Sequence, residues 1–503
     1  MQRMILAIDQ GTTSTRAIVF DLDWRPRAVK QIPLKQHFPH PGWVEHDAEE
    51  IWRATLQTCR EAIAEVGGAA AIAAVGVTNQ RETTVLWERA TGHALHKAIV
   101  WQDRRTAEAC DRLRARDGLE AKVQHETGLV LDPYFSASKI AWLLDRVEGA
   151  RERAVRGELC AGTIDCWLMF KLTGGRSHVT DVTNASRTSL LGIEDLAWRP
   201  DLLELFDVPA SVLPSVLPCA GEFGVTEAGL FGRAFPITGV AGDQQAALVG
   251  HAALAPGETK ITYGTGAFLV ANVGDHPAWS KNKLLGTVGF QAGGRTAYAL
   301  EGSIFSAGST VQWLRDGLEA IGASRESEAL AQGLPDNGGV YLVPGFTGLG
   351  APWWAAEARG AILGMTRDTT KAHVVRAGLE AMAYQTADLL DALAADGAPA
   401  PPVLKVDGGV TANGWAMQFL ADVCRTPVER PSFQEMTALG AARLAALGVG
   451  LIDSLDVEAV ETPTRWEPRM SDKERDRLLS GWKGAVAGVL AMARRASPPT
   501  SKC

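Results

Sequence analysis

The chain has 503 residues, of which 46% are hydrophobic, and its 50 Lys plus Arg against 58 Asp plus Glu give a net charge of −8. This length and composition support buried cores in about two to four domains, without disulfides or structural metals to hold them together. Positive and negative residues are mixed along the chain instead of forming blocks, so we expect no nucleic-acid partner.

The sequence also bears on where the protein works. Its seven cysteines include no CxxC pair and no zinc-type Cys/His spacing, which suits a reducing cytoplasm. The apolar run 4–8 ends at Asp9 and is too short for a signal peptide. The small-apolar run 66–77 is well below the roughly 20 residues of a membrane-spanning helix. We therefore expect a soluble cytoplasmic protein with no membrane span.

The N-terminal half is predicted to alternate strands and helices. Residues 4–8 and 16–20 are β-prone, and the polar segment between them has the residue types of a tight turn. Asp47 and Glu50 form a capping-box pattern ahead of apolar residues at helical spacing, which predicts an amphipathic helix through Val66. Similar patterns indicate further strands at 71–77, 83–87 and 98–101, and helices from Thr106 and over 136–146.

A second half is predicted to begin near residue 255, so we assign residues 1–254 and 255–503 to two domains. In the second, ITYGTG and AFLVANV again place a Gly-Thr turn between strands, which hints at a duplicated architecture. The patterns there predict a long helix over 373–394, a strand over 403–410, a helix from Asn413, a surface connection at 397–402 and a mobile tail at 496–503. The whole pattern favours an α/β fold.

A loop at the end of the first strand carries candidate chemistry. Asp9 ends the strand, and the residues after it have backbone N–H groups that can cradle an anion, with Arg16 as a fixed positive charge nearby: Gly11, Thr12, Thr13 and Ser14. An ordinary hairpin turn uses the same residue types, and this reading is the more common one for such a loop taken alone.

A second candidate is Asp243, which follows the small-residue run GVAG at the end of a β-like segment and precedes Gln244. Phosphoryl transfer to an alcohol needs a base of this kind. A strand-terminal Asp is more often a helix cap, so the carboxylate by itself decides nothing. Because the chain has no GxxxxGK[ST] motif and no protein-kinase glycine loop, any ATP must be held by another scheme, which the Gly-Thr turns offer.

Ten segments extend the pattern in order from residue 9 to 413: DQGTTSTRA, PGWVEHD, TNQRETT, WQDRRTAE, TGLVLDPYFSASK, TNASRT, AGDQQAAL, YGTGAF, FTGLGAPWW and VDGGVTAN. Together they resemble the glycerol kinases of the FGGY family of carbohydrate kinases. The resemblance implies an α/β protein with two actin-like, ribonuclease H-like domains hinged over a central cleft, which transfers the γ-phosphoryl group of ATP, with Mg²⁺, to glycerol. It also implies a homo-oligomer, either a dimer or a tetramer.

By this resemblance, the glycerol site is made by the N-terminal domain and the aromatic residues beside it. Asp243 is implied as the catalytic base and as a glycerol ligand. The other implied substrate-binding residues are Arg81, Glu82, Trp101, Tyr134, Gln244 and Phe268.

The resemblance also implies a nucleotide site shared between the domains. Asp9 is implied to position the magnesium ion. The residues implied to bind the nucleotide are Gly11, Thr12, Thr13, Ser14, Arg16, Thr265, Gly266, Gly308, Gln312, Gly409 and Asn413.

One loop departs from the family's regulated members. Residues 232–236 resemble the segment through which some bacterial glycerol kinases bind the inhibitor fructose 1,6-bisphosphate, but Ala234 stands where those enzymes carry an arginine. We therefore do not expect this inhibition, although Arg233 is adjacent. Two other functions stay open at this point: a sister FGGY kinase acting on a pentulose or larger polyol, and a nucleotide-driven switch or filament subunit of the same fold.

Overall fold

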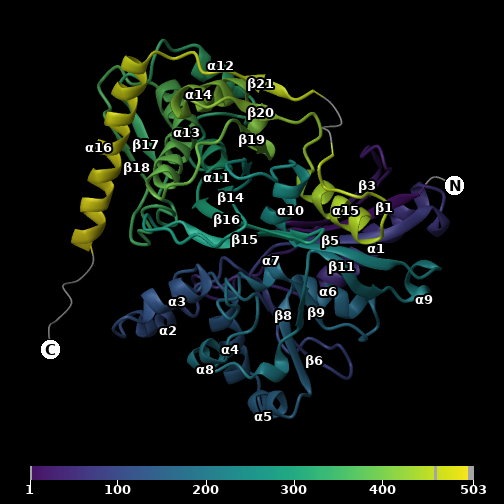
Figure 1. Cartoon of the computed structure of the whole chain (residues 1–503). Coiled ribbons are helices and arrows are strands. Elements are labelled where there is room, and N and C mark those ends of the chain that lie inside the picture. The colour runs from purple at the N-terminus through teal and green to yellow at the C-terminus, as the bar shows by residue number, and fades with distance from the viewer. Residues whose placement is uncertain (1–2, 458–461, 497–503) are drawn as a thin grey trace.

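The computed structural model describes residues 3–457 and 462–496, and two large mixed sheets organise them (Figure 1). The first sheet has the strand order β11-β12-β5-β1-β2-β3. β1 pairs antiparallel with β2 and parallel with β5, which is in turn parallel to β12. The strands are β1 (Met4–Gln10), β2 (Ser14–Phe20), β3 (Pro26–Pro33), β5 (Ile72–Asn79), β11 (Ala220–Val225) and β12 (Pro236–Gly242).

The second sheet repeats this topology. Its order is β15-β16-β14-β13-β19-β20-β21, in which β13 is antiparallel to β14 and parallel to β19, just as β1 is to β2 and β5. The Gly-Thr turn of each half joins the corresponding hairpin, so the hinted duplication is present in the strand order. The strands are β13 (Thr259–Tyr263), β14 (Ala267–Gly274), β15 (Leu285–Ala292), β16 (Arg295–Ile304), β19 (Leu404–Asp407), β20 (Val428–Arg430) and β21 (Thr464–Trp466).

Both faces of the first sheet are covered, which explains why its first strand is apolar at every position from Met4 to Ile8. In β1, Leu6 and Ile8 pack with α1 (Ala48–Glu65), whereas Ile5 and Ala7 pack with α15 (Met436–Gly448). Alternate side chains of a strand point to opposite faces, so two covering helices require an unbroken apolar run. α15 therefore belongs spatially to the first sheet although it lies in the C-terminal half of the sequence.

The contact between α15 and the sheet depends on glycine. A Cβ atom on Gly76 of β5 would lie 2.2 Å from the carbonyl oxygen of Ala441, and one on Gly239 of β12 would lie 2.2 Å from the amide nitrogen of Ala445. Helix and sheet backbones meet here at a distance that no other residue allows. α10 (Asp243–Gly250) packs closely against the same helix.

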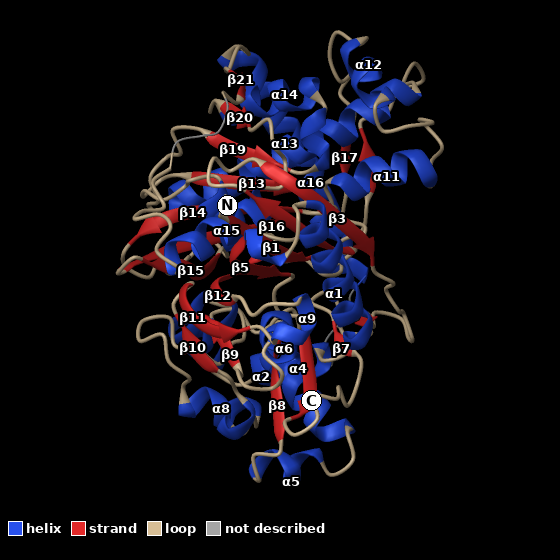
Figure 2. Cartoon of the chain, turned by 90° about the vertical axis from the view of Figure 1, so that its right-hand side faces the viewer, coloured by secondary structure: helices blue, strands red, loops and turns tan. Residues whose placement is uncertain are grey.

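A third group of elements lies below the first sheet, as Figure 2 shows. Its strands form a four-stranded sheet, β4-β7-β6-β8, and a two-stranded one, β10-β9. The elements are β4 (Glu45–His46), β6 (Thr84–Glu88), β7 (Ala98–Ile99), β8 (Leu159–Thr163), β9 (Val179–Asp181), β10 (Ser215–Leu217), α2 (Ala107–Arg114), α3 (Leu119–Thr127), α4 (Ser136–Arg146), α5 (Ala150–Val155), α6 (Ile164–Leu172), α7 (Val182–Ala185), α8 (Pro200–Phe206) and α9 (Ala228–Phe231).

The second sheet has its own covering helices, in the upper part of both views. α13 is buried along most of its length and carries the largest core of the chain. The remaining elements are α11 (Gly308–Asp316), α12 (Glu326–Gln332), α13 (Lys371–Ala395), α14 (Gly414–Cys424), α16 (Asp472–Ala496), the strands β17 (Tyr341–Val343) and β18 (Ala361–Leu363), and the 3-10 turns η1 (Ala69–Ala71), η2 (Ala210–Val212) and η3 (Gly409–Ala412).

Most predicted elements are present, with two differences. Asp47 caps α1 by accepting the N–H groups of Glu49 and Glu50, but the Glu50 carboxylate accepts the Lys35 N–H instead of completing a capping box. The strand predicted over 403–410 ends at Asp407, because Gly408 has φ +92° and turns the chain into η3. The predicted mobile tail begins at residue 496 and otherwise lies outside the described residues.

Candidate active site

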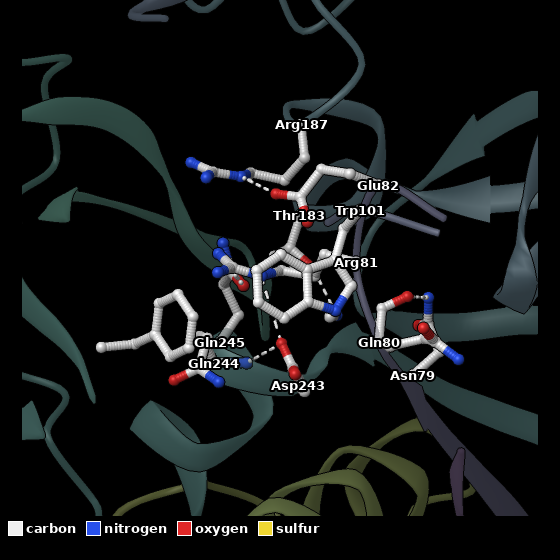
Figure 3. A network of polar contacts seen from close by, with 12 residues as sticks. Asn79, Gln80, Arg81, Glu82, Trp101, Thr183, Arg187, Asp243, Gln244 and Gln245 are labelled. Atoms are coloured by element: carbon white, nitrogen blue, oxygen red, sulfur yellow. Dashed lines mark hydrogen bonds and ion pairs between the residues drawn. The ribbon is translucent and has the colours of Figure 1, made fainter. Parts of the chain in front are cut away.

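The parallel pairing of β5 and β12 brings two sequence motifs together. Gly242 lies opposite Asn79 in the sheet, so the residues after each strand emerge at the same edge. Arg81 follows β5, Asp243 begins α10 after β12, and their Nε and Oδ1 atoms are 3.1 Å apart (Figure 3). Oδ1 of Asp243 also accepts the Gln244 N–H, so this carboxylate has the helix-terminal role as well as a place in the site.

The Arg81 side chain is fixed by contacts with several buried residues. It is 3% exposed, and its guanidinium donates to both carboxylate oxygens of Glu301, at 3.1 Å for Nη2 to Oε1. It also lies within hydrogen-bonding distance of Gln245 Oε1 (3.4 Å) and Tyr134 Oη (3.5 Å). Because the guanidinium is planar and its donors are fixed, this set of partners leaves Arg81 one orientation.

Glu82 is placed by its backbone as well as its side chain. Its φ is +58°, a left-handed conformation that is uncommon for a residue other than glycine. The Glu82 carbonyl accepts the hydroxyl groups of Thr84 (3.0 Å) and Ser136 (3.1 Å), and its carboxylate accepts Arg187 Nε at 2.7 Å. These contacts hold the unusual turn, and burial raises the pKa of the Glu82 carboxyl group.

Two residues that were not predicted complete the charge network. Glu301 of β16 is fully buried and binds Arg81 and Arg187, the latter at 3.0 Å to Nη2. Burial alone would raise the pKa of Glu301, but the two guanidinium groups outweigh it and lower the pKa to about 2. The available signal was a charged residue inside the otherwise apolar or small strand AYALEGSIF. Arg187 lies in the quoted motif TNASRT, but no role was assigned to it.

Aromatic side chains from both halves of the chain stand beside this network. Trp101 lies edge-on to Tyr134 and to Phe268 of β14, with ring centroids 5.7 and 6.0 Å apart. Trp101 Nε1 donates to Thr12 Oγ1 at 2.9 Å, which ties this wall to the first Gly-Thr loop. The buried ammonium of Lys139 donates to the backbone carbonyl groups of residues 133–135 and thereby fixes the loop that carries Tyr134.

Gln244 faces a buried cation that was not predicted. Its Oε1 atom accepts a hydrogen bond from Nζ of Lys260, on β13, which also donates to Thr262 Oγ1 at 3.1 Å. Burial lowers the pKa of Lys260 to about 8. The first and second sheets therefore both contribute charged groups to one site, with Glu301 and Lys260 coming from the second.

The first Gly-Thr loop presents a single carboxylate. Asp9 is 3.5 Å from Arg16, whose Nη1 also binds Oε2 of Glu435 at 2.7 Å. Burial raises the pKa of Asp9 to about 7 against the opposing effect of Arg16, and Glu435 and Asp243 reinforce the rise. Ser14 is buried on β2 with its hydroxyl accepting from Gln31, so the loop itself is residues 11–13. Glu435, at the start of α15, was not predicted.

Three backbone turns of the C-terminal half lie together. They are the Gly-Thr turn between β13 and β14, the start of α11 at Gly308, and the turn η3 at Gly409. Gly308 N–H donates to Gly264 O at 2.9 Å, and a Cβ atom on Gly308 would lie 2.5 Å from that oxygen and 3.3 Å from Val410. A Cβ atom on Gly266 would lie 2.5 Å from the carbonyl oxygen of Ile304, whereas one on Gly409 would meet nothing within 4 Å. The backbone is therefore closely packed at Gly266 and Gly308, whereas the space beside Gly409 is open.

The remaining predicted nucleotide residues sit around these turns. Thr265 is exposed at the tip of the β13–β14 hairpin, and Gln312 is exposed one helical turn after Gly308 on α11. Asn413 caps α14 by accepting the Ala416 N–H at 2.9 Å, and its amide donates to Ser327 Oγ. The structure therefore gives Asn413 a structural role and leaves its nucleotide contact a prediction.

A divalent cation would fit here only with help from its substrate. Within residues 3–457 and 462–496, no group of three or more His, Cys, Asp or Glu side chains is placed to hold a metal ion. Mg²⁺ usually keeps several waters and takes one or two carboxylates together with substrate phosphates. Asp9, a carboxylate beside an anion-binding type of loop, matches that mode. Among the helices in the described part of the chain, none is long and apolar enough to cross a membrane.

Comparison with known proteins identifies the family. The N-terminal domain of the FGGY family of carbohydrate kinases matches residues 4–250, and its C-terminal domain matches residues 259–449. The chain is 56% identical over 492 residues to the glycerol kinase of Ectopseudomonas mendocina and to glycerol kinase 1 of Pseudomonas aeruginosa, covering 97% of this chain and 99% of each relative.

A solved structure agrees in fold along nearly the whole chain. The crystal structure of Plasmodium falciparum glycerol kinase with ADP superposes with a TM-score of 0.91 at 37% identity, covering 97% of this chain and 98% of that one. The predicted α/β fold with two related domains is confirmed by this match and by the repeated sheet topology. The chain is a member of the FGGY family of carbohydrate kinases, in its glycerol kinase group.

Proposed function

We propose that the protein is a glycerol kinase that transfers the γ-phosphoryl group of ATP to a terminal hydroxyl of glycerol, giving sn-glycerol 3-phosphate and ADP. The observation that carries the proposal is the contact between Asp243 and an immobilised Arg81, which puts a base beside hydroxyl-binding groups at the edge of the first sheet. The 56% identity to curated glycerol kinases supports the choice of glycerol over other FGGY substrates.

In this mechanism glycerol lies against the Arg81, Glu82 and Tyr134 side chains, with Trp101 and Phe268 against its carbon skeleton. Arginine donates and glutamate accepts, so the pair can fix two neighbouring hydroxyl groups. The reacting hydroxyl gives its proton to the Asp243 carboxylate, its oxygen bonds to the γ-phosphorus, and the bond from phosphorus to the β,γ-bridging oxygen breaks, releasing ADP. Positioning and electrostatics supply most of the catalysis.

The nucleotide phosphates lie between the two Gly-Thr turns. N–H groups of residues 11–13 and of Thr265 and Gly266 face the terminal phosphates, and Arg16 adds a positive charge. Asp9 would hold a Mg²⁺ ion directly or through water, and the ion would supply neutralisation of the phosphate charge. The turns around Gly308 and Gly409 receive the rest of the nucleotide, with Gln312 and Asn413 beside them, because the side chain that Gly409 lacks leaves room there.

The first test measures ADP release from MgATP with glycerol, dihydroxyacetone, xylulose, ribulose and no acceptor. A strong preference for glycerol is expected. Preference for a pentulose would move the protein to a sister FGGY kinase, and turnover without any acceptor dependence would favour a nucleotide-driven switch.

The second test addresses the base. Asp243→Asn keeps the side-chain size and an oxygen that can accept the Gln244 N–H, but it removes the basic carboxylate. We expect turnover to fall by about a hundredfold or more while calorimetry shows MgATP binding within about threefold of wild type. Loss of MgATP binding would instead give Asp243 a nucleotide-binding role.

Other properties extend this proposal. We propose a cytoplasmic homo-oligomer, a dimer or tetramer, with the domains hinged near residue 255. The six cysteines within the described residues are free and buried, which is compatible with a reducing compartment. The loop 232–236 carries Ala234 on an exposed segment, and we propose no fructose 1,6-bisphosphate inhibition through it.

A further inference from the structure

A large cavity lies at the other end of α10 from Asp243. It has a volume of about 620 Å³ and is lined by segments that are distant in sequence: Trp24, Gly250, Lys405, Phe433 and Arg443 among them. Cavities of roughly 300–1,000 Å³ are the size of small-molecule sites. None of the residues assigned above to the glycerol or nucleotide site lines this cavity. It is therefore separate from the proposed active site.

The walls of the cavity are apolar on one side and cationic on another. Met436, Leu439 and Arg443 lie at positions i, i+3 and i+7 of α15, so they form one stripe along the helix. Trp24 completes the apolar wall from the turn between β2 and β3, held at φ +61°. A cavity of this kind suits a ligand with an apolar body.

Arg443 is the unusual group in this wall. It is 2% exposed, yet none of the described residues offers it a carboxylate partner. Only Nη1 donates hydrogen bonds, to the carbonyl groups of Val249 (3.4 Å) and Gly250 (3.0 Å), and the buried Nε has no hydrogen-bond partner within the described part of the chain. The guanidinium carbon also lies 5.5 Å from the centroid of the Trp24 ring, a contact that uses none of its N–H groups. Buried arginines are usually paired with an acid, so this guanidinium has unused hydrogen-bonding capacity for an anion.

The other charged groups of the cavity also favour an anion. Arg25 and Lys405 add two cations, and Lys405 is shared with Glu258 at 2.9 Å. Among the described residues of the lining, the one carboxylate is that of Glu429, and it is bound by Arg465. The described residues of the lining thus carry an excess of positive charge beside an apolar wall.

We propose that this cavity is a regulatory site for a small organic anion, whose charged group pairs with Arg443 while its apolar body packs against Trp24, Phe433 and Leu439. The apolar walls determine which neutral body fits the cavity. The anionic group that pairs with the guanidinium can be a carboxylate, a sulfonate or a phosphoryl group. This assignment of a binding site does not depend on the catalytic reaction. Its effect on turnover, argued next, rests on the proposed function.

α10 connects the cavity to the proposed base. The helix has eight residues and is therefore about 12 Å long. Asp243 is its first residue, and the two carbonyl groups that bind Arg443 belong to its last two residues, Val249 and Gly250. Arg443 stabilises this helix end, because a cation there offsets the partial negative charge of the carbonyl groups. An anion that draws the guanidinium away loosens α10, so Asp243 loses its alignment with Arg81. Occupancy of the cavity therefore inhibits the enzyme.

A second connection runs to the nucleotide turns. His251, which also lines the cavity, follows α10, and its Nε2 is 3.1 Å from Oδ2 of Asp407. Asp407 ends β19 immediately before Gly408 and Gly409. The cavity is therefore linked to both proposed substrate sites: to the glycerol site through α10, and to the nucleotide site through His251 and β19.

Fluorescence titration with anilinonaphthalene sulfonate tests the site, and phenylnaphthylamine, the same ring system without the sulfonate, is the neutral control. We expect one sulfonate probe per chain, unaffected by saturating glycerol and MgATP, and binding of the neutral probe at least about tenfold weaker. Displacement by MgATP would place the probe in the nucleotide cleft and overturn the proposal. Equal binding of the two probes would do the same.

Variants separate the cavity from nonspecific adsorption. Arg443→Met should weaken the sulfonate probe about tenfold, and Leu439→Phe, which fills the cavity and keeps the arginine, should weaken it comparably. Arg112→Gln, an exposed arginine on α2, is the matched control and should bind as wild type does. Unchanged binding in Leu439→Phe would overturn the site even if Arg443→Met fails to fold.

Inhibition is measured separately from binding. The sulfonate probe should lower kcat for glycerol phosphorylation in wild type and Arg112→Gln, with little effect in Leu439→Phe. Probe binding at the cavity with unchanged kcat would overturn the coupling through α10. Absence of any glycerol phosphorylation would refute the proposed function and leave the binding result standing by itself.

Discussion

Glu301→Gln is the substitution that tests the charge network most directly. The wild-type carboxylate is fully buried and accepts hydrogen bonds from Arg81 through two nitrogens and from Arg187 through one. A glutamine of nearly the same shape offers one oxygen, and its NH₂ group faces a guanidinium that can only donate. The two arginines are then left with Glu82 and Asp243 as their acidic partners.

The size of the effect follows from the titration of Glu301. A pKa lowered from 4.5 to about 2 corresponds to about 3 kcal/mol of interaction favouring the charged form. This agrees with the roughly 3–5 kcal/mol for breaking a buried ion pair by removing one partner. We therefore expect a loss of about 3 kcal/mol in the free energy of unfolding, and a fall of about a hundredfold in kcat/KM for glycerol because Arg81 loses its fixed orientation.

The assay combines urea unfolding with initial rates at varied glycerol and MgATP. Glu108→Gln removes an exposed helical ion pair with Arg112 and is the matched control, with an expected loss below about 1 kcal/mol. The KM for MgATP should change much less than kcat/KM for glycerol. A variant with wild-type stability and wild-type kcat/KM for glycerol would refute the assignment of Glu301 as a positioning residue.

Three further predictions concern the substrate sites. Arg81→Ala should raise the KM for glycerol by at least about tenfold more than that for MgATP, because its partners surround the polyol site, and equal losses in steady-state kinetics would contradict this. Since ionised Asp9 attracts the cation and burial raises its pKa to about 7, the KM for MgATP should rise as pH falls below 7, by up to about tenfold per pH unit. Asp9→Asn should bind MgATP more weakly than wild type above pH 7 and should lack this pH dependence. A KM that is independent of pH in wild type would refute the prediction. Phe268→Ala should raise the KM for glycerol, since the variant removes one aromatic wall, and calorimetry showing unchanged glycerol affinity would exclude that wall from the site.

The sequence by itself determined the local elements and the residues that share a motif. The apolar run of β1, the turn after it and the N-cap of α1 are set by neighbours in the chain, so their patterns predicted them. Arg81 and Glu82 are adjacent in the sequence. The motif that contains them is one of those through which nearly the full chain resembles the glycerol kinases. Such features need no knowledge of which strands pair.

Only the tertiary structure identified those partners of the site residues that lie far away in the sequence. Glu301 and Lys260 lie on strands of the second sheet, and their contacts with Arg81 and Gln244 depend on how the two sheets meet. Glu435 reaches Arg16 because α15 crosses back onto the first sheet.

The same packing created the cavity beside Arg443. A charge inside an apolar helix is visible in the sequence, but whether a carboxylate or a cavity faces it is decided by residues far away in the chain. Hydrophobic patterning fixes which face of an element is buried, whereas the partner across that face follows from the packing of whole sheets and helices.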